Sequence, residues 1–261
     1  MKKYIPNLFT LLNLFSGVLA ILMAASDRLV AAAGFVLLGI FFDFFDGFFA
    51  RKFNVQGELG KQLDSLADVV TSGVVPGIVM FQLLLHTVRD RWFMELSCEE
   101  GSWSTFDETF YYFIPFIGLV IPLAAAYRLA NFNIDERQTD SFIGLPTPAF
   151  AIFVISLPLI LAYDPGSFLA NWIQSTYVLI GITLAGCYMM NANLPLFSLK
   201  FKSYGWKGNE FPYVFLTLSA VLLFLFNLAG TPMIIVLYVI MSLIQNKLVG
   251  DKSVENKKPG N

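Results

Sequence analysis

Charged residues are scarce in this chain of 261 residues. They make up 14% of the sequence, whereas hydrophobic residues make up 56%. A soluble domain has about 25% charged and about 45–50% apolar residues. The excess of apolar side chains requires a solvent other than water, so an ordinary soluble domain is excluded and a membrane protein is indicated.

Histidine, cysteine and clustered basic residues are also rare. The single histidine is His86, and the two cysteines, Cys98 and Cys187, are predicted to lie at different depths. We therefore expect neither a disulfide nor a zinc site. The formal net charge is −2 and no basic patch is interleaved with aromatic residues, so we expect no nucleic-acid partner.

Long apolar segments recur along the chain, each close to the length of a helix that crosses the hydrocarbon core of a membrane. Eight such segments predict an all-α fold, a polytopic bundle of transmembrane helices. They are Leu8–Ala25, Leu29–Ala50, Leu66–His86, Tyr111–Asn131, Thr147–Tyr163, Asn171–Met190, Phe211–Leu228 and Thr231–Leu248.

The basic residues predict how this bundle is oriented. An even number of spans puts both termini on one side of the membrane. Most of the 17 Lys and Arg residues fall on that side, and only Arg28, Arg89 and Arg91 fall opposite. Because Lys and Arg are retained in the cytoplasm, both termini are predicted to be cytoplasmic.

Four aspartates lie where charge is costly, inside or beside apolar segments, and such residues are usually functional. Asp43 and Asp46 are near the cytoplasmic end of the second segment, and Asp64 and Asp68 are near the start of the third. Spacings of three and four residues place each pair on one face of a helix. Glycines in the connecting loop allow the two helices to run antiparallel, so the four carboxylates are expected to converge.

Converging carboxylates repel one another unless they are protonated or neutralised by cations. Oxygen ligands favour Mg²⁺ or Mn²⁺, and four aspartates suffice for two ions that clamp a phosphate during an in-line displacement. Two alternatives remain. Each aspartate alone could cap a helix or pair with Arg51, Lys52 or Lys61, and an ion pathway could use them, although the other segments show no comparable polar residues.

These residues stand at the spacing of a known signature. The chain has Asp43, Asp46, Gly47, Ala50, Arg51, Gly60, Asp64 and Asp68 at every fixed position, and in this it resembles the CDP-alcohol phosphatidyltransferases. The resemblance implies a six-helix catalytic core, usually homodimeric, that binds a CDP-linked lipid and two divalent metal ions. It implies that Asp43, Asp46 and Asp64 ligate metal and that Asp68 is both a metal ligand and the general base. It places Asp43, Gly47, Ala50, Arg51 and Gly60 around the CDP group.

The rest of the chain divides around that core. We predict a catalytic core over residues 1–195, an additional C-terminal transmembrane hairpin over residues 196–250, and a disordered tail over residues 251–261, which is polar and charged. Because the aspartates lie at the predicted cytoplasmic ends of their segments, we expect an active site that faces the cytoplasm, in a bacterial-type cytoplasmic membrane.

The signature indicates the CDP-linked donor, whereas the alcohol that accepts the phosphatidyl group has to be predicted from segments outside the signature. They resemble those of the integral-membrane phosphatidylserine synthases of this family, which implies CDP-diacylglycerol and L-serine as substrates among the membrane lipids. The segments are Ile5–Asn13, Leu63–Val70, Tyr127–Asn133, Phe142–Pro148 and Leu194–Lys200. One departure is Asn131, where that subfamily usually has Arg. Other acceptors with the same chemistry are glycerol 3-phosphate, inositol and inositol phosphate, and a cation transporter is the alternative of another class.

Arg128 is the basic residue predicted inside a span, near the depth of the aspartates. A bidentate contact with the serine carboxylate would suit it. It could instead reach lipid headgroups or pair with Asp135. Asn7, Asn13 and Asn131 are candidates for the same acceptor pocket, or they satisfy backbone groups at helix ends.

Overall fold

The computed structural model describes residues 4–96, 113–134, 142–197, 205 and 209–255, and these residues are almost entirely helical. The long helices are α1 (Tyr4–Ala25), α2 (Leu29–Lys52), α3 (Glu58–Asp68), α4 (Val75–Leu96), α6 (Val120–Ile134), α7 (Thr147–Tyr163), α9 (Thr176–Asn191), α10 (Glu210–Phe226) and α11 (Gly230–Glu255). Shorter helical turns are η1 (Val69–Val74, a π-helix), η2 (Pro115–Leu119), α8 (Phe168–Ile173) and η4 (Asn227–Ala229).

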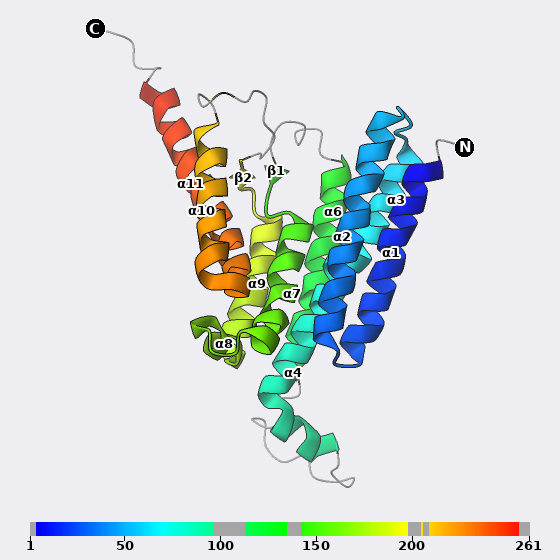
Figure 1. The fold of residues 1–261 in the computed structure, drawn as a ribbon, viewed down its shortest axis with the longest axis vertical. Coiled ribbons are helices and arrows are strands. Elements are labelled where there is room, and N and C mark those ends of the chain that lie inside the picture. Colours follow the sequence, from blue (N-terminus) through cyan, green and yellow to red (C-terminus); the bar gives the residue numbers. More distant parts are fainter. Residues whose placement is uncertain (1–3, 97–112, 135–141, 198–204, 206–208, 256–261) are drawn as a thin grey trace.

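The helices run side by side in one bundle (Figure 1). The first three helices lie at its right edge and the α10–α11 hairpin at its left edge. The first turn of α1 and the end of α11 lie at the same end of the bundle, the top in this view. This arrangement matches an even number of spans, and the orientation relative to the cytoplasm stays a prediction.

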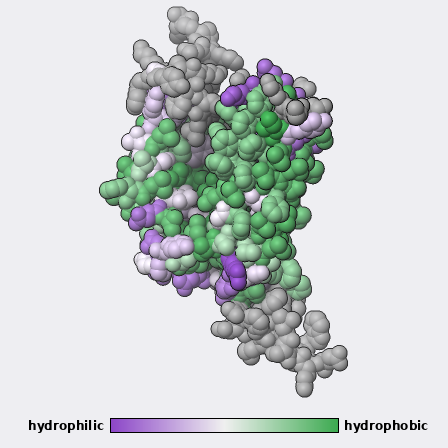
Figure 2. All heavy atoms as spheres, turned by 45° about the vertical axis from the view of Figure 1, so that its right-hand side comes forward, coloured by the Kyte–Doolittle hydropathy of each residue, from purple (hydrophilic) through white to green (hydrophobic). Residues whose placement is uncertain are grey.

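The surface is that of an integral membrane protein. Figure 2 shows hydrophobic side chains over the middle of one face, with hydrophilic ones gathered mainly towards its two ends. Five helical stretches are long and apolar enough to cross a membrane, and α7 and α9 are shorter apolar helices. The last of the five, Glu210–Lys247, contains both helices of the C-terminal hairpin. The predicted polytopic all-α fold is confirmed.

Several predicted helix limits were wrong. The third span begins at Glu58, eight residues before its predicted start, because polar residues extend the helix beyond the apolar segment. The sixth predicted segment is interrupted between α8 and α9, where Ser175 has an extended backbone. Helix α11 continues to Glu255, so the first residues of the tail expected to be disordered are helical. Residues 256–261 lie outside the described residues.

Two short strands tie the hairpin to the core. β1 (Phe142–Ile143) pairs antiparallel with β2 (Pro195–Leu196). The Tyr238 hydroxyl on α11 donates a 2.8 Å hydrogen bond to the Phe197 carbonyl, just after β2. Gly144 has a φ of 75° and a Cβ there would lie 2.4 Å from the Met190 carbonyl oxygen, so only glycine fits this turn. The turn leads directly into α7.

Candidate metal centre and adjoining cavity

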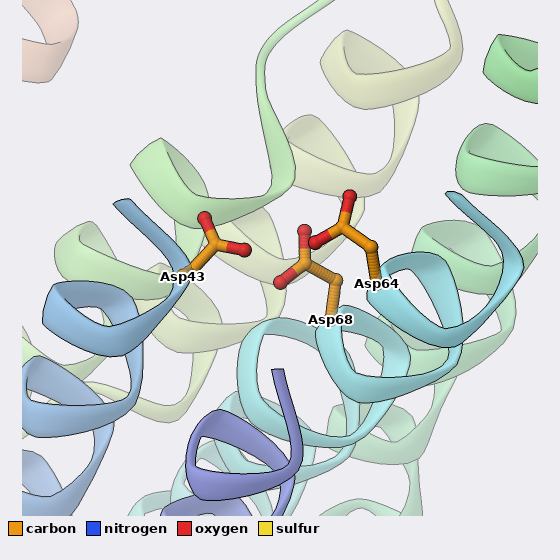
Figure 3. Close-up of side chains that lie close together, drawn as sticks. All are labelled: Asp43, Asp64 and Asp68. Atoms are coloured by element: carbon orange, nitrogen blue, oxygen red, sulfur yellow. The ribbon is translucent and has the colours of Figure 1, made fainter. Parts of the chain in front are cut away.

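Three aspartates come together near the end of the bundle where α2 is followed by α3. Asp43 lies on α2, and Asp64 and Asp68 lie one turn apart on α3. One carboxylate oxygen of each lies within 4.8 Å of the others. Figure 3 shows the three carboxyl groups facing one another across the space between the two helices. The two helices thus bring these residues together, as their spacing predicts.

The fourth aspartate, Asp46, is not one of these three but lies close by and contacts α1. It is buried on α2, and its Oδ2 accepts a 2.6 Å hydrogen bond from Thr10 Oγ1 on α1. That length is typical of a hydroxyl donating to a carboxylate. Asp46 still borders the same cavity as Asp64. Its role as a metal ligand therefore stays a prediction.

The donor set fits a hard divalent cation. Within the described part of the chain, the cluster of potential ligands consists of carboxylates alone. Oxygen ligands of this kind suit Mg²⁺ or Mn²⁺. Like charges this close together and partly buried repel one another, and a bound cation would relieve that repulsion. Asp43, Asp64 and Asp68 therefore fit a divalent metal, whereas the number of ions stays a prediction.

A cavity of about 460 Å³ adjoins the aspartates and is lined by residues of α1, α2 and α3. The lining includes the predicted signature positions Asp46, Gly47, Ala50, Gly60 and Asp64. Gly47, Ala50 and Gly60 are small, so they leave space for a substrate group beside the acidic residues.

Of two other predicted site residues, Asn7 lines this cavity and Arg51 does not. Asn7, predicted for the acceptor, lines the same cavity as the positions predicted for CDP. Arg51 is exposed on the last turn of α2 and is not part of the lining. Its predicted contact with the CDP group would therefore be made from the rim.

Arg128 is buried on α6, with 8% of its surface exposed. Its Nη1 donates a 3.1 Å hydrogen bond to Thr147 Oγ1 at the start of α7. Its Nε has no hydrogen-bond partner among the described residues. Arg128 lies close enough to Asp68 for their charges to interact. A buried guanidinium with donors to spare is suited to an anionic group of a substrate.

The two remaining acceptor candidates differ in position. Asn13 is fully buried on α1, and its Nδ2 donates to Asp68 Oδ1 at 3.3 Å. It therefore contacts the acidic cluster directly. Asn131 is exposed on α6, so it does not share the buried setting of Arg128. Asp135, the alternative partner of Arg128, lies outside the described residues.

Three polar contacts around the site were not predicted from the sequence. Thr10 belongs to a segment that resembles the subfamily, but the sequence assigns it no role, although it binds Asp46. Lys61 Nζ donates to the Asn133 carbonyl at 2.7 Å, and Asn133 Nδ2 donates to Ser65 Oγ at 2.8 Å. These two contacts join α3 to the end of α6. The spacing of Lys61 and Ser65, four residues apart, was the available signal for a shared face.

Comparison with known proteins identifies the family to which the chain belongs. The family model for CDP-alcohol phosphatidyltransferase matches residues 3–244. The chain belongs to this family. It is therefore a CDP-alcohol phosphatidyltransferase, an enzyme of phospholipid synthesis in a membrane, and the transporter alternative is set aside. The family uses divalent metals, which agrees with the carboxylate cluster.

Several relatives of the chain are named for serine. A CDP-diacylglycerol–serine O-phosphatidyltransferase of Helicobacter pylori is 28% identical over 254 residues, 97% of this chain and 94% of the relative. One of Bacillus subtilis is 32% identical over 167 residues, 62% of this chain and 78% of the relative. An archaetidylserine synthase of Methanothermobacter thermautotrophicus is 32% identical over 158 residues, 59% of this chain and 58% of the relative.

Proposed function

We propose that the chain transfers the phosphatidyl group of CDP-diacylglycerol to the hydroxyl of L-serine, giving phosphatidylserine and CMP. The observation that carries this proposal is the convergence of Asp43, Asp64 and Asp68 beside a cavity lined by the signature positions. The names of the relatives support serine as the acceptor.

The cavity is the proposed donor site. The CMP part of the donor would occupy the space beside Gly47, Ala50 and Gly60, which places its phosphates near the aspartates. Arg51, at the rim, would contact the same group from the end of α2. Asp43, Asp46, Asp64 and Asp68 would hold two divalent ions, which when bound supply positive charge against the phosphate oxygens.

Asp68 is the proposed general base. The serine oxygen forms a bond to the phosphorus of the phosphatidyl group, and the bond from that phosphorus to the oxygen of CMP breaks. The proton of the serine hydroxyl passes to the Asp68 carboxylate. Asn13 already donates to Oδ1 of Asp68, so Oδ2 is the oxygen that we assign to proton transfer.

Arg128 is the proposed partner of the serine carboxylate. Replacing it with Met removes the charge and the donors, so the KM for serine should rise about 10- to 100-fold, the range expected for a lost charge-assisted hydrogen bond. The KM for CDP-diacylglycerol should change much less. Initial rates of CMP release, measured while each substrate is varied in turn, give both values.

Arg28→Met is the matched control for this prediction. Arg28 is an exposed arginine that precedes α2 at the opposite end of that helix from the aspartates, so its loss should leave the KM for serine unchanged. If Arg128→Met raises the KM for CDP-diacylglycerol and not that for serine, Arg128 belongs to the donor site and the proposal for the acceptor carboxylate is wrong.

The acceptor itself is tested by competition between alcohols. Purified protein with CDP-diacylglycerol and Mn²⁺ should incorporate labelled serine into lipid, in preference to glycerol 3-phosphate, inositol or inositol phosphate. A phosphorylated acceptor carries more negative charge than serine and calls for further cations. Among the cations near the site, Arg128 is buried, Arg51 is exposed, and Lys61 lines the cavity but already donates to the Asn133 carbonyl. Turnover of another alcohol without serine incorporation would overturn the assignment.

The setting of the enzyme is also a proposal. The bundle would have both termini and the aspartates on the cytoplasmic side of a bacterial-type membrane, as the distribution of basic residues predicts. The homodimer implied by the family resemblance would be tested by the mass of the protein in detergent. The division into a core of residues 1–195 and an additional hairpin stays a prediction.

A further inference from the structure

Helix α1 donates hydrogen bonds to two of the four aspartates, one on each acidic helix. Thr10 contacts Asp46 on α2, and Asn13 contacts Asp68 on α3. We infer that α1 is a positioning element of the metal centre, in which Thr10 and Asn13 orient these two carboxylates for cation binding. Both residues lie outside the signature. The inference rests on the proposed metal ligation by the aspartates and is independent of the acceptor alcohol.

Thr10 is the better defined of the two contacts. The residue is 3% exposed, and its hydroxyl lies 2.6 Å from Asp46 Oδ2 and 3.2 Å from the Pro6 carbonyl oxygen. A hydroxyl has one proton to donate, and the shorter contact to a carboxylate is the stronger of the two. The proton is therefore directed at Asp46, which fixes one of its carboxylate oxygens.

Asn13 is oriented by the carboxylate that it contacts. The residue is fully buried, and its Nδ2 faces Asp68. Its Oδ1 has no hydrogen-bond partner among the described residues and lies 2.9 Å from where a Cβ on Gly39 would be. Turning the amide over would place its oxygen against the Asp68 carboxylate. An unpaired buried amide oxygen is destabilising, and the hydrogen bond from Nδ2 to Asp68 offsets part of that cost.

The backbone around these donors is closely packed. Thr10, Asn13 and Gly17 follow one face of α1, and Thr71 Oγ1 of the π-helical turn donates to the Asn13 carbonyl at 3.2 Å. A Cβ on Gly17 would lie 2.5 Å from Thr71 Oγ1, and one on Gly39 would lie 2.7 Å from Thr71 Cγ2. Helices α1 and α2 therefore pack against the turn after Asp68 with no room for a side chain at Gly17 or Gly39, and this close packing supports the two donors.

The inference is tested by Mn²⁺ binding to the full-length protein in detergent, without lipid substrate or acceptor. Thr10→Val keeps the shape of the side chain and removes the donor, and Asn13→Leu does the same for the amide. Each should weaken Mn²⁺ binding about tenfold or more, because groups that orient metal ligands typically affect affinity by that amount. Calorimetry and the paramagnetic resonance signal of free Mn²⁺ both report the dissociation constant.

Two variants separate positioning from general packing. Thr10→Ser retains the hydroxyl and should bind Mn²⁺ nearly as tightly as the wild type. Ser16→Ala removes another buried hydroxyl of α1, which donates to the Leu12 carbonyl, and it should leave Mn²⁺ binding unchanged. If Asn13→Leu does not fold, the comparison of Thr10→Val with Thr10→Ser decides.

The inference is overturned if Thr10→Val binds Mn²⁺ as tightly as the wild type, or if Thr10→Ser is weakened as much as Thr10→Val. Failure of the proposed function gives a different result. Wild-type protein that binds Mn²⁺ but incorporates no serine contradicts the acceptor assignment alone, whereas wild-type protein that binds no divalent cation contradicts metal ligation by the aspartates.

Discussion

Replacing Asp68 with Asn should lower turnover about 1,000-fold or more while the protein stays folded and binds CDP-diacylglycerol. Asn has nearly the same shape as Asp, and its side-chain oxygen can still accept the hydrogen bond from Asn13. The amide does not, however, take up the proton of an acceptor hydroxyl, and it is a weaker metal ligand. CMP release in single-turnover and steady-state assays measures the loss, and binding of labelled CDP-diacylglycerol shows that the donor site is intact.

Asp27→Asn is the control for that substitution. Asp27 lies in the turn between α1 and α2, at the opposite end of α1 from Thr10, and its Oδ1 is 2.7 Å from His86 Nε2. Its replacement changes one charge by the same amount and should leave turnover near that of the wild type. Near-normal turnover of Asp68→Asn would mean that the proton of the acceptor goes elsewhere, and the assignment of Asp68 as general base would be wrong.

The carboxylate cluster was the part of the site that local pattern could predict. Asp64 and Asp68 are four residues apart, so any helix places them on one face, and the short connection after α2 makes the two acidic helices neighbours. Hydropathy likewise predicted most of the bundle, because a span must be apolar over the thickness of the membrane. Helix ends were less predictable. Helix α3 begins with polar residues, and a hydropathy pattern does not assign such residues to a membrane span.

The contacts that orient the carboxylates could not be predicted in the same way. Thr10 is 36 residues from Asp46 and Asn13 is 55 residues from Asp68. Such contacts depend on the rotation of α1 about its axis, and that rotation is set by close packing at Thr71. Helix α1 is apolar on most sides, so its sequence alone does not indicate which face turns inward. A polar residue in an apolar helix predicts a buried contact without naming its partner.

The π-helical turn after Asp68 is a second feature without a sequence signal. Residues Val69–Val74 form wider turns than the helices on either side, and Thr71 and Ser72 within them are buried. Such turns occur frequently at functional sites, because an added residue changes which side chains share a face. Here the π-helical turn lies between Asp68, the proposed base, and α4. The faces of α3 and α4 therefore need not line up as they would along one regular helix.

The acidic cluster should make the metal-free protein less stable than one of its own variants. Asp43, Asp64 and Asp68 place like charges within 4.8 Å of one another in a partly buried setting. Their repulsion opposes folding, and it is relieved by a bound cation or by removal of one charge. Asp64→Asn removes one charge and one proposed metal ligand together. In the presence of a chelator it should therefore unfold at a higher temperature than the wild type.

Addition of Mn²⁺ should reverse that order. A cation at 100 times its dissociation constant stabilises the folded state by about 2.7 kcal/mol, which raises the unfolding temperature by about 5–10 °C for a chain of this size. The wild type should show this rise and Asp64→Asn should not, as measured by thermal unfolding in detergent with and without Mn²⁺. Asp164→Asn, a change in the turn between α7 and α8, should behave as the wild type in both conditions. An equal rise in wild type and Asp64→Asn would show that the cation binds elsewhere, and with that result the assignment of Asp64 as a metal ligand could not stand.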